Sequence, residues 1–443
     1  MTTGDTIYAV SSGAGKAGIA VIRVSGGGAA EAITGMTGSL PGPRRAVLAT
    51  IRNPGTGEVL DRGIVLWLPG PQSVTGEDVA EFHVHGSAAV ISGVFAAFGR
   101  YGNMRPAEPG EFTRRAFANG RMDLVEAEGL ADLLSARTPK QRQQAIYHLM
   151  GAASSIYEDW RLKLLGILAR VEAAVDFADE EGVAETALAN VRGDIALLAG
   201  EMAAALDSVD RAAAIRQGIK VVLAGLPNTG KSSLLNALAR REAAIVSSRP
   251  GTTRDVIEVE VEIEGLAVVL TDTAGLREHS PDEIETIGIA RTRRELDGAD
   301  LVVWVSSPDV EGSDMPWSGV EPALRVLNKM DLIEAGSGLF NMGAIAISAQ
   351  SGAGVPEMLA ELGRLVRAKY GQAEHGAIVR DRQKHAVAES IRYLNESMSH
   401  DASQLELAAE DLRKAAHSLA RITGRIDVED LLSAIFSEFC IGK

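Results

Sequence analysis

One stretch, VVLAGLPNTGKSSLLNAL, limits the fold of this chain more than any other part of its sequence. It fits the spacing G-x-x-x-x-G-K-[ST] with Gly225, Gly230, Lys231 and Ser232. An apolar run precedes the glycines and an amphipathic run follows them, which is the strand, turn and helix of a phosphate-binding loop. Lys231 is expected to reach the β and γ phosphates, and Ser232 to bind Mg²⁺. The stretch therefore predicts a P-loop nucleotide-binding domain.

Three later segments indicate the metal and the base. Asp272 opens the segment DTAG after the apolar run LAVVLTD, where its carboxylate can hold an Mg²⁺-bound water. The segment NKMD places Asp331 after a further apolar run, where a carboxylate can accept from guanine N1–H and N2–H₂. Adenine carries no proton on N1, so a buried acceptor selects guanine. The segment SAQ at 348–350 is expected to support the base through a backbone N–H. The predicted nucleotide is GTP.

The residue that orients the attacking water is not obvious from the sequence. Ras-like enzymes use a Gln directly after the glycine of their DTAG-like segment, whereas this chain has Leu276 there. A leucine side chain cannot orient water. The nearby polar candidates are Glu278, Asp282, Glu283 and Glu285.

The pattern of apolar residues predicts a multidomain α/β protein. Residues 1–120 contain short apolar runs separated by Gly and Pro, and GIAVIRVSG, GIVLWLPG and VAEFHVHG are the expected strands of an α+β domain. Residues 121–217 and 377–443 have helical periodicity, whereas strands and helices alternate over 218–376 in the manner of a doubly wound sheet. The two helical parts are expected to form one helical domain, interrupted by an inserted Ras-like P-loop domain.

One helical stripe is clearest in SIYEDWRLKLLGILARVEAAVDF, where apolar residues recur every three or four positions. A second stripe, in VEDLLSAIFSEFC, predicts a C-terminal helix whose inward side carries Cys440, the only cysteine. From these positions alone Cys440 is either a small buried hydrophobe or a reactive group. The C-a-a-X spacing of CIGK does not suit a lipid anchor, because Gly442 is not aliphatic.

Composition excludes several classes of protein. The start MTTGDTIYAV lacks the features of a signal peptide, and no apolar run approaches the length of a membrane span, so a cytoplasmic location is expected. The net charge of -15 argues against a protein that coats nucleic acid non-specifically. A local basic cluster is either an RNA contact or a solvated face; it comprises Arg105, Arg114, Arg115, Arg121, Lys140 and Arg142.

The chain resembles the tRNA modification GTPase family MnmE (TrmE) over essentially its whole length. The resemblance rests on TGEDVAEFHVHG and RPAEPGEFTRRAF in the first part, on GLPNTGKSSLLNAL, RPGTTRD, DTAGLRE and NKMD in the second, and on the terminal FCIGK. It implies a potassium-stimulated GTPase domain that dimerises across its nucleotide faces. It also implies a first domain, 1–120, that binds tetrahydrofolate and forms a homodimer.

The resemblance assigns roles around GTP. K⁺ would be bound by Asn228, Ser247, Arg249 and Thr252, and Mg²⁺ by Ser232 and Thr253. The catalytic glutamate corresponds to Glu285, with Glu283 as the alternative because of an apparent one-residue insertion at HSPDE. The expected GTP contacts are Asn228, Thr229, Gly230, Lys231, Ser232, Ser233, Ser247, Ser248, Arg249, Pro250, Gly251, Thr252, Thr253, Asp272, Thr273, Ala274, Gly275, Asn328, Lys329, Asp331, Ser348 and Ala349.

The resemblance also assigns folate contacts to Arg23, Glu81, Arg121 and Lys443, with Arg121 in place of the family's lysine. It gives Cys440 a role in modification but not in hydrolysis. Glu81, His83 and His85 alternate on one strand face, which leaves a metal site as an alternative, although no fourth ligand is identified.

The resemblance implies a function in tRNA modification. With the FAD-dependent partner MnmG, in a heterotetramer, the enzyme would modify C5 of the tRNA wobble uridine to the carboxymethylaminomethyl form. The one-carbon unit would come from 5-formyl- or methylene-tetrahydrofolate. The alternative is a regulatory GTPase that acts in ribosome or RNA assembly without a role in tRNA modification.

Overall fold

The computed structural model describes residues 4–13, 15–176, 183–240, 258–272, 296–310, 321–332, 343–371 and 376–426, together with 432, 435–437, 439, 441 and 442. The chain divides into two compact units. The first contains Met1–Ala131, His148–Arg161 and Ala416–Lys443, and the second contains Asp132–Tyr147 and Leu162–Ala415. Among the described helices, none is long and apolar enough to cross a membrane.

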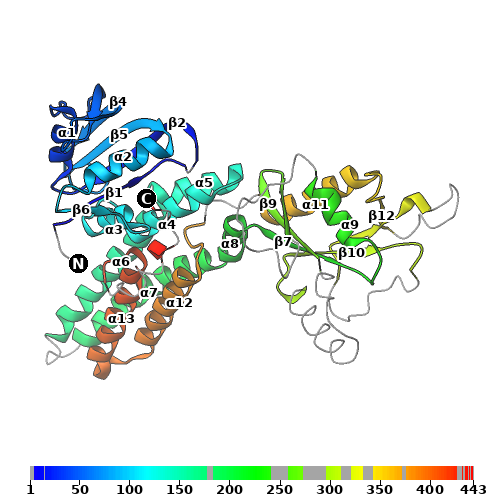
Figure 1. Ribbon diagram of the computed structural model, residues 1–443. Helices are drawn as coiled ribbons and strands as arrows, with labels where there is room; N and C mark the ends of the chain where they lie inside the picture. The colour runs from blue at the N-terminus through cyan, green and yellow to red at the C-terminus, as the bar shows by residue number, and fades with distance from the viewer. Residues whose placement is uncertain are drawn as a thin grey trace, which may run out of the picture. The chain divides into compact units, whose positions relative to one another are not determined.

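The first unit is built on a six-stranded sheet in the order β3-β4-β5-β2-β1-β6 (Figure 1). Its strands are β1 (Thr6–Val10), β2 (Ala17–Ser25), β3 (Val47–Arg52), β4 (Val59–Leu68), β5 (Val79–Gly86) and β6 (Met104–Pro106). All neighbours pair antiparallel except β1 and β6. The three apolar runs predicted as strands are β2, β4 and β5, which confirms that prediction.

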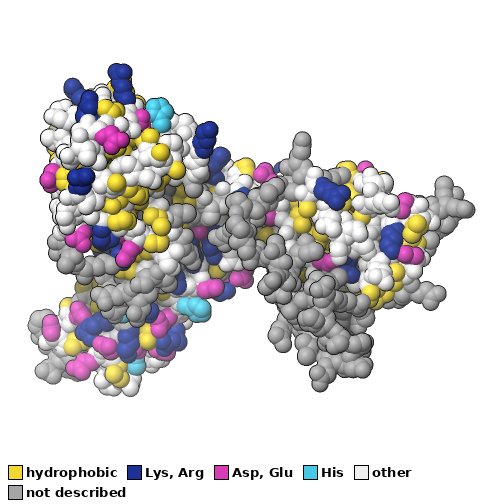
Figure 2. Space-filling model, in the orientation of Figure 1, with side chains coloured by type: hydrophobic (Ala, Val, Ile, Leu, Met, Phe, Trp, Pro, Cys, Tyr) yellow, Lys and Arg dark blue, Asp and Glu magenta, His cyan; other side chains and the backbone are white. Residues whose placement is uncertain are grey.

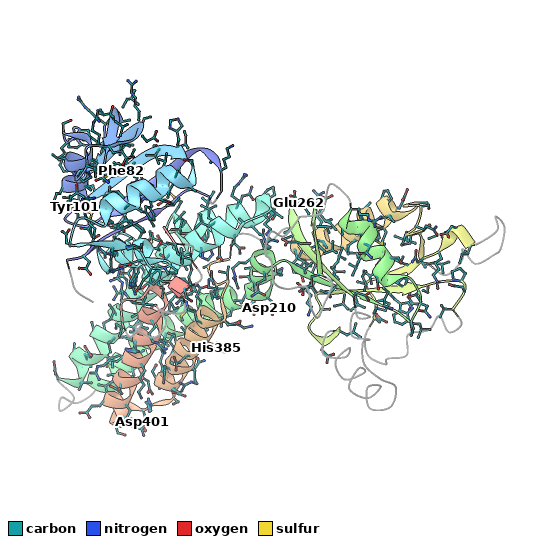
Figure 3. The ribbon with its side chains drawn as sticks, in the orientation of Figure 1. Phe82, Tyr101, Asp210, Glu262, His385 and Asp401 are labelled. Carbon is teal, nitrogen blue, oxygen red and sulfur yellow. The ribbon has the colours of Figure 1, made fainter. Side chains whose placement is uncertain are left out.

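The larger apolar cluster of the first unit lies on one face of this sheet. Ile22, Val24 and Phe82 point into it and are fully buried beneath α1 (Ala29–Thr37) and α2 (Ala88–Phe98). Phe82, labelled in Figure 3, packs edge-on against Phe98 at 5.5 Å between ring centroids. Because successive strand residues point to opposite faces, Arg23 and its cross-strand partner Glu81 lie on the other face. That second face also carries a smaller apolar cluster, formed by Ile7, Ala9, Ala107 and Phe112, next to the Arg23 and Glu81 pair.

Two further helices complete this part of the first unit. They are α3 (Glu111–Ala118) and α4 (Leu124–Ser135). The last four residues of α4, from Asp132 on, belong to the second unit. Near the C-terminus, the buried Phe436 and Phe439 cluster with Ala127. The hydroxyl of Ser11 donates to the carbonyl of Gly442 at 3.0 Å. The inward stripe expected of the C-terminal segment is therefore confirmed at Phe436 and Phe439, while Cys440 lies outside the described residues.

The second unit contains a six-stranded sheet in the order β12-β11-β10-β7-β9-β8. The strands are β7 (Ile219–Ala224), β8 (Glu258–Ile263), β9 (Leu266–Asp272), β10 (Leu301–Ser306), β11 (Leu324–Leu327) and β12 (Ile345–Ala346). All neighbours are parallel except β8 and β9. The helices α9 (Lys231–Ala239) and α11 (Val355–Tyr370) bury Leu234, Leu235 and Leu362 in the same apolar cluster as β7. This is the expected P-loop sheet.

Along the chain, helices come both before and after the P-loop sheet. They are α5 (Pro139–Leu149), α6 (Ala152–Val175), α7 (Val183–Leu206) and α8 (Val209–Gln217) before it, and α12 (Asp381–Ser399), η3 (Ala402–Gln404) and α13 (Leu405–Thr423) after it. The predicted stripe of α6 is confirmed, since Trp160, Leu164 and Val171 are buried. The chain combines an α+β part with a helical region that a P-loop sheet interrupts, which confirms the predicted fold class. The bounds of the four predicted domain ranges stay predictions.

Candidate functional site

The phosphate loop, residues 225–230, joins β7 to α9, and Lys231 is the first residue of α9. Lys231 is buried, and its Nζ donates to the carbonyls of Gly225 and Leu226, both at 3.0 Å. The hydroxyl of Thr229 donates to the carbonyl of Leu226 at 2.9 Å. The ammonium group therefore lies inside the curve of the loop, at the helix N-terminus, where positive charge favours a phosphate.

Two glycines are required by close contacts. A Cβ at Gly225 would lie 2.1 Å from the carbonyl oxygen of Val305, and one at Gly230 would lie 2.3 Å from the amide nitrogen of Asn328. Gly230 also has a φ of +87°, in the left-handed region. The motif therefore has glycine where β10 and the base-binding segment approach the loop.

Ser232 and Asp272 form the metal end of the site. The Ser232 hydroxyl donates to Asp272 Oδ2 at 2.6 Å, and Asp272 is buried at the end of β9. A hydroxyl and a carboxylate oxygen are the hard ligands that Mg²⁺ prefers. The pair fits a Mg²⁺ ion held directly by Ser232 and through water by Asp272, where the ion would neutralise phosphate charge.

Hydrogen bonds of Asn328 link the segments expected to bind the base, NKMD and SAQ, to the phosphate loop. This side chain is buried; its Nδ2 donates to the carbonyl of Thr229 at 3.0 Å, and its Oδ1 accepts from the N–H of Ala349 at 3.0 Å. Asp331 Oδ1 accepts from the Ser348 hydroxyl at 2.5 Å. The structure thus brings together residues predicted from NKMD, SAQ and the phosphate loop.

Sequence reasoning missed Asp309, which lies just after β10. Its Oδ2 is 2.6 Å from the ammonium nitrogen of Lys329, and this contact holds the pKa of the Asp309 carboxyl below its ordinary value. Lys329 itself has a φ of +60°. A polar residue directly after a predicted parallel strand was the available signal, because such residues gather at the carboxyl edge of the sheet.

Many predicted site residues lie outside the described residues. They are Ser247, Ser248, Arg249, Pro250, Gly251, Thr252, Thr253, Thr273, Ala274, Gly275, Leu276, Glu278, Asp282, Glu283, Glu285, Cys440 and Lys443. Asn228 is described, is exposed and has a φ of +64°. Ser233 is in the first turn of α9.

In the first unit, Arg23 and Glu81 meet across β2 and β5. Both Nε and Nη2 of Arg23 donate to Glu81 Oε1, at 3.1 and 3.0 Å, while His83 Nε2 lies 3.2 Å from Glu81 Oε2. The Arg23 guanidinium also lies over the Phe112 ring. Arg121 packs against Gly76 after α3. The side chains of Arg23 and Glu81 thus form one cluster of predicted folate residues.

The metal alternative for Glu81, His83 and His85 is not supported by their contacts. His85 pairs with Asp61 at 2.8 Å rather than with the other two. Burial raises the pKa of Asp61, but hydrogen bonds from His85 outweigh it and hold that pKa below its ordinary value. Across the described part of the chain, no group of three or more His, Cys, Asp or Glu side chains is arranged to hold a metal.

The basic cluster expected as an RNA contact or a solvated face includes structural residues. Arg105 donates to both carboxylate oxygens of the buried Glu111, at 2.9 and 2.7 Å, and Arg115 donates to one of them at 3.0 Å. Burial raises the pKa of Glu111, but hydrogen bonds from Arg105, the Glu108 N–H and Arg115 lower it to about 2. The burial of this carboxylate could not be predicted from the sequence, because a charged residue is expected to be exposed.

Charge on the helices of the second unit is balanced locally. Figure 2 shows acidic and basic side chains intermingled over the helices labelled α7, α12 and α13 in Figure 1. Ion pairs such as Arg392–Glu396, Arg413–Glu172 and Lys414–Asp411 account for part of this pattern. This face therefore lacks, among its described residues, the single-sign patch that non-specific nucleic-acid binding requires.

The phosphate loop, the Ser232–Asp272 pair and the Ser348–Asp331 pair after β11 are the arrangement of a P-loop GTPase. Family models described as "MnmE helical domain" and "GTP-binding protein TrmE N-terminus" match residues 124–440 and 6–121. The chain belongs to the MnmE family of tRNA modification GTPases. It is a GTP-hydrolysing enzyme, and its family binds GTP with Mg²⁺.

Two relatives illustrate how complete the match is. The tRNA modification GTPase MnmE of Methylobacterium sp. is 50% identical over 443 residues, which cover 99% of this chain and all of that protein. The corresponding protein of Parvibaculum lavamentivorans is 48% identical over 443 residues, with the same coverage. The predicted family is therefore confirmed over the full chain.

Proposed function

We propose that this chain is a potassium-stimulated GTPase that modifies C5 of the tRNA wobble uridine together with an FAD-dependent partner of the MnmG class. The transferred one-carbon unit comes from 5-formyl- or methylene-tetrahydrofolate. The product is the carboxymethylaminomethyl uridine. The observation that supports the proposal is the arrangement of Lys231 in the phosphate loop, Ser232 on Asp272 and Ser348 on Asp331, in a chain that matches MnmE relatives from end to end.

The potassium role rests on Asn228. It is exposed at the phosphate loop and offers a side-chain oxygen next to Thr229 and Gly230. In the proposal, Asn228 binds K⁺ together with oxygens of Ser247, Arg249 and Thr252, and Thr253 joins Ser232 on Mg²⁺. A cation there supplies the charge that an arginine finger supplies in other GTPases. Glu285, or alternatively Glu283, positions the attacking water.

The folate role rests on the Arg23 and Glu81 pair. Its two charged groups lie at 16–20% side-chain exposure, partly shielded from water, on the sheet face opposite the core. Partial burial strengthens hydrogen bonds between charged groups and a polar heterocycle. Arg121 and Lys443 complete the proposed site, and Cys440 is the proposed reactive group. A homodimer and its heterotetramer with the partner are the proposed assembly.

The test is a reconstituted reaction of the full chain with the partner protein, tRNA, GTP and the folate donor, followed by nucleoside analysis. The modified uridine is expected to form in KCl and to fall at least about tenfold in NaCl or with Asn228→Ala, given the effect of losing one transition-state contact. Cys440→Ser is expected to block modification while GTP hydrolysis continues. Formation of the product without GTP, K⁺ or folate would contradict the proposal.

A further inference from the structure

The chain passes twice between the helices of the second unit and the inserted P-loop sheet. An arginine at each of these two passages contacts the carboxylate of Asp132. Arg216 lies in the last turn of α8, three residues before β7 begins, and Arg380 is the N-cap of α12. Arg380 Nη2 donates to Asp132 Oδ1 at 2.7 Å, and Arg216 Nη1 lies 3.8 Å from the same oxygen. Asp132 thus contacts the residue that leads into the sheet and the residue that leads out of it.

The two passages also bond to each other. Arg216 Nε donates to the carbonyl of Val379 at 3.2 Å. The fully buried Gln383 accepts from the N–H groups of Val379 and Arg380, at 2.9 and 3.2 Å. The side chains of Asp132, Arg216 and Arg380 are 17–21% exposed. Because these side chains are mostly shielded from water, removing the Asp132 charge takes a stabilising opposite charge away from Arg216 and Arg380.

A second carboxylate, that of Asp300, links the first strand and the last helix of the inserted part. Asp300 Oδ2 accepts from the N–H of Lys220 at the start of β7, at 2.8 Å. Its Oδ1 accepts from the Tyr370 hydroxyl at the end of α11, at 2.7 Å. The first strand and the last helix of the inserted part are therefore fixed to each other, at Lys220, four residues after Arg216, and at Tyr370, ten residues before Arg380.

The helix α5 connects this arrangement to the GTP site. On one side, Gln141 and Gln144 donate to the carbonyls of Arg216 and Ala212, at 3.2 and 3.1 Å. On the other, the N–H of Lys140 donates to the carbonyl of Gly265 in the β8–β9 turn at 3.3 Å, and Arg137, just before α5, pairs with Glu260 of β8. The strand β9 ends at Asp272, the partner of Ser232.

We propose that Asp132 is a positioning residue that locks the two passages together, so that the GTP-binding part and the helices α8 and α12 move as one body. A change at the GTP site then reaches the helices instead of being absorbed by bending at the two passages. The link to tRNA chemistry rests on the proposed function, whereas the mechanical lock does not.

The test compares Asp132→Asn with a matched control on the same pair of helices. Asp210, labelled in Figure 3, lies on α8 and pairs with Lys384 of α12 at 3.1 Å, but its side chain is 91% exposed. In Asp132→Asn, amide hydrogen exchange at 212–218 and 379–384 is expected to speed up at least tenfold. The rate constant for GTP hydrolysis is expected to stay within twofold, while modification in the reconstituted reaction falls at least tenfold. Asp210→Asn is expected to match the wild-type chain in all three.

Two variants of Arg380 keep the test decisive if Asp132→Asn folds poorly. Arg380→Gln is expected to reproduce the fast exchange and the lost modification, and Arg380→Lys, which keeps the charge, to recover most of both. The proposed lock would be overturned if amide hydrogen exchange in Asp132→Asn and Arg380→Gln were as slow as in the wild-type chain. It would also be overturned if these variants lost GTP hydrolysis and tRNA modification to the same extent. If the wild-type chain does not modify tRNA, the proposed function fails, and the exchange comparison alone decides the lock.

Discussion

We expect the carboxylate of Asp331 to select guanine over other bases by accepting hydrogen bonds from it. The Ser348 hydroxyl holds one of its carboxylate oxygens, which fixes the orientation of the group. Guanine presents two donors, N1–H and N2–H₂, that a carboxylate can accept together. Xanthine has a carbonyl in place of the amino group, so it suits a side chain that both donates and accepts. An amide at residue 331 should therefore exchange one nucleotide for the other.

We expect Asp331→Asn to lower kcat/KM for GTP by about 10³ or more and to raise that for XTP, because guanine N2–H₂ would then face an amide donor, and a site that leaves a polar group of its substrate unpaired rejects that substrate by about 10⁴. Steady-state hydrolysis of both nucleotides measures this. Glu361→Gln is the matched control: it removes a carboxylate on α11 that, among the described residues, pairs only with the exposed Arg364, and it should change both nucleotides by no more than a few-fold. Equal losses for GTP and XTP in Asp331→Asn would contradict the role of Asp331.

Glu111 is the second residue whose charge has a large expected effect. Its pKa falls from 4.5 to about 2 in the folded chain. Because the folded pKa is the lower one, the stabilisation is present above about pH 4.5 and is lost as the pH falls through about 2. The shift corresponds to about 3 kcal/mol at neutral pH.

We therefore expect Glu111→Gln to lower the free energy of unfolding of the first unit by about 3 kcal/mol at pH 7, a value that follows from the pKa shift. The difference from wild type should shrink as the pH falls below about 4.5. Urea unfolding across that pH range measures it. Glu108→Gln, which changes an exposed partner of Arg114, should have little effect. A difference that does not vary with pH would show that the Glu111 charge is not responsible.

Residues whose role depends on local spacing were predictable, and those whose role depends on distant contacts were not. Lys231 and Ser232 follow from a short motif because a loop and the helix after it make the phosphate site. The bridge from Asn328 to Thr229 joins residues 99 positions apart, and that from Arg380 to Asp132 joins residues 248 apart. No periodicity in a single sequence encodes such pairs.

At the scale of elements, alternation along β2 and β5 determines what each face carries. Ile22, Val24 and Phe82 bury one face, so Arg23 and Glu81 must emerge together on the other. The strands were predictable because the period of two is a local property. Their order was not, because β2 lies between β1 and β5 and the β1–β6 pair joins segments far apart in sequence.

We expect Arg23→Ala to weaken binding of 5-formyltetrahydrofolate to the full chain at least about tenfold, since hydrogen bonds to charged groups contribute about 1.5–3 kcal/mol. Calorimetric titration measures this. Arg52→Ala is the matched control, because Arg52 is an exposed arginine of the same sheet, at the end of β3. Equal affinities for Arg23→Ala and wild type would remove Arg23 from the folate site.

At the scale of the whole molecule, a P-loop sheet interrupts a helical region, and Asp132 contacts one arginine before the sheet, Arg216, and one after it, Arg380. The insertion was predictable, because helical periodicity stops near 217 and resumes after the sheet. The family match places this chain among the tRNA modification GTPases. We propose that GTP hydrolysis at Lys231 and Ser232 drives chemistry elsewhere in the same chain.

The most direct measurement is the level of modified wobble uridine in tRNA from cells that lack this protein and carry either the wild-type chain or Lys231→Ala. We predict that wild type restores the modified nucleoside. Lys231→Ala should leave it at least about tenfold lower, because loss of one charge contact in phosphoryl transfer costs about 10²–10³ in rate. Restoration by Lys231→Ala at equal protein level, or failure of wild type to restore the nucleoside, would contradict the account.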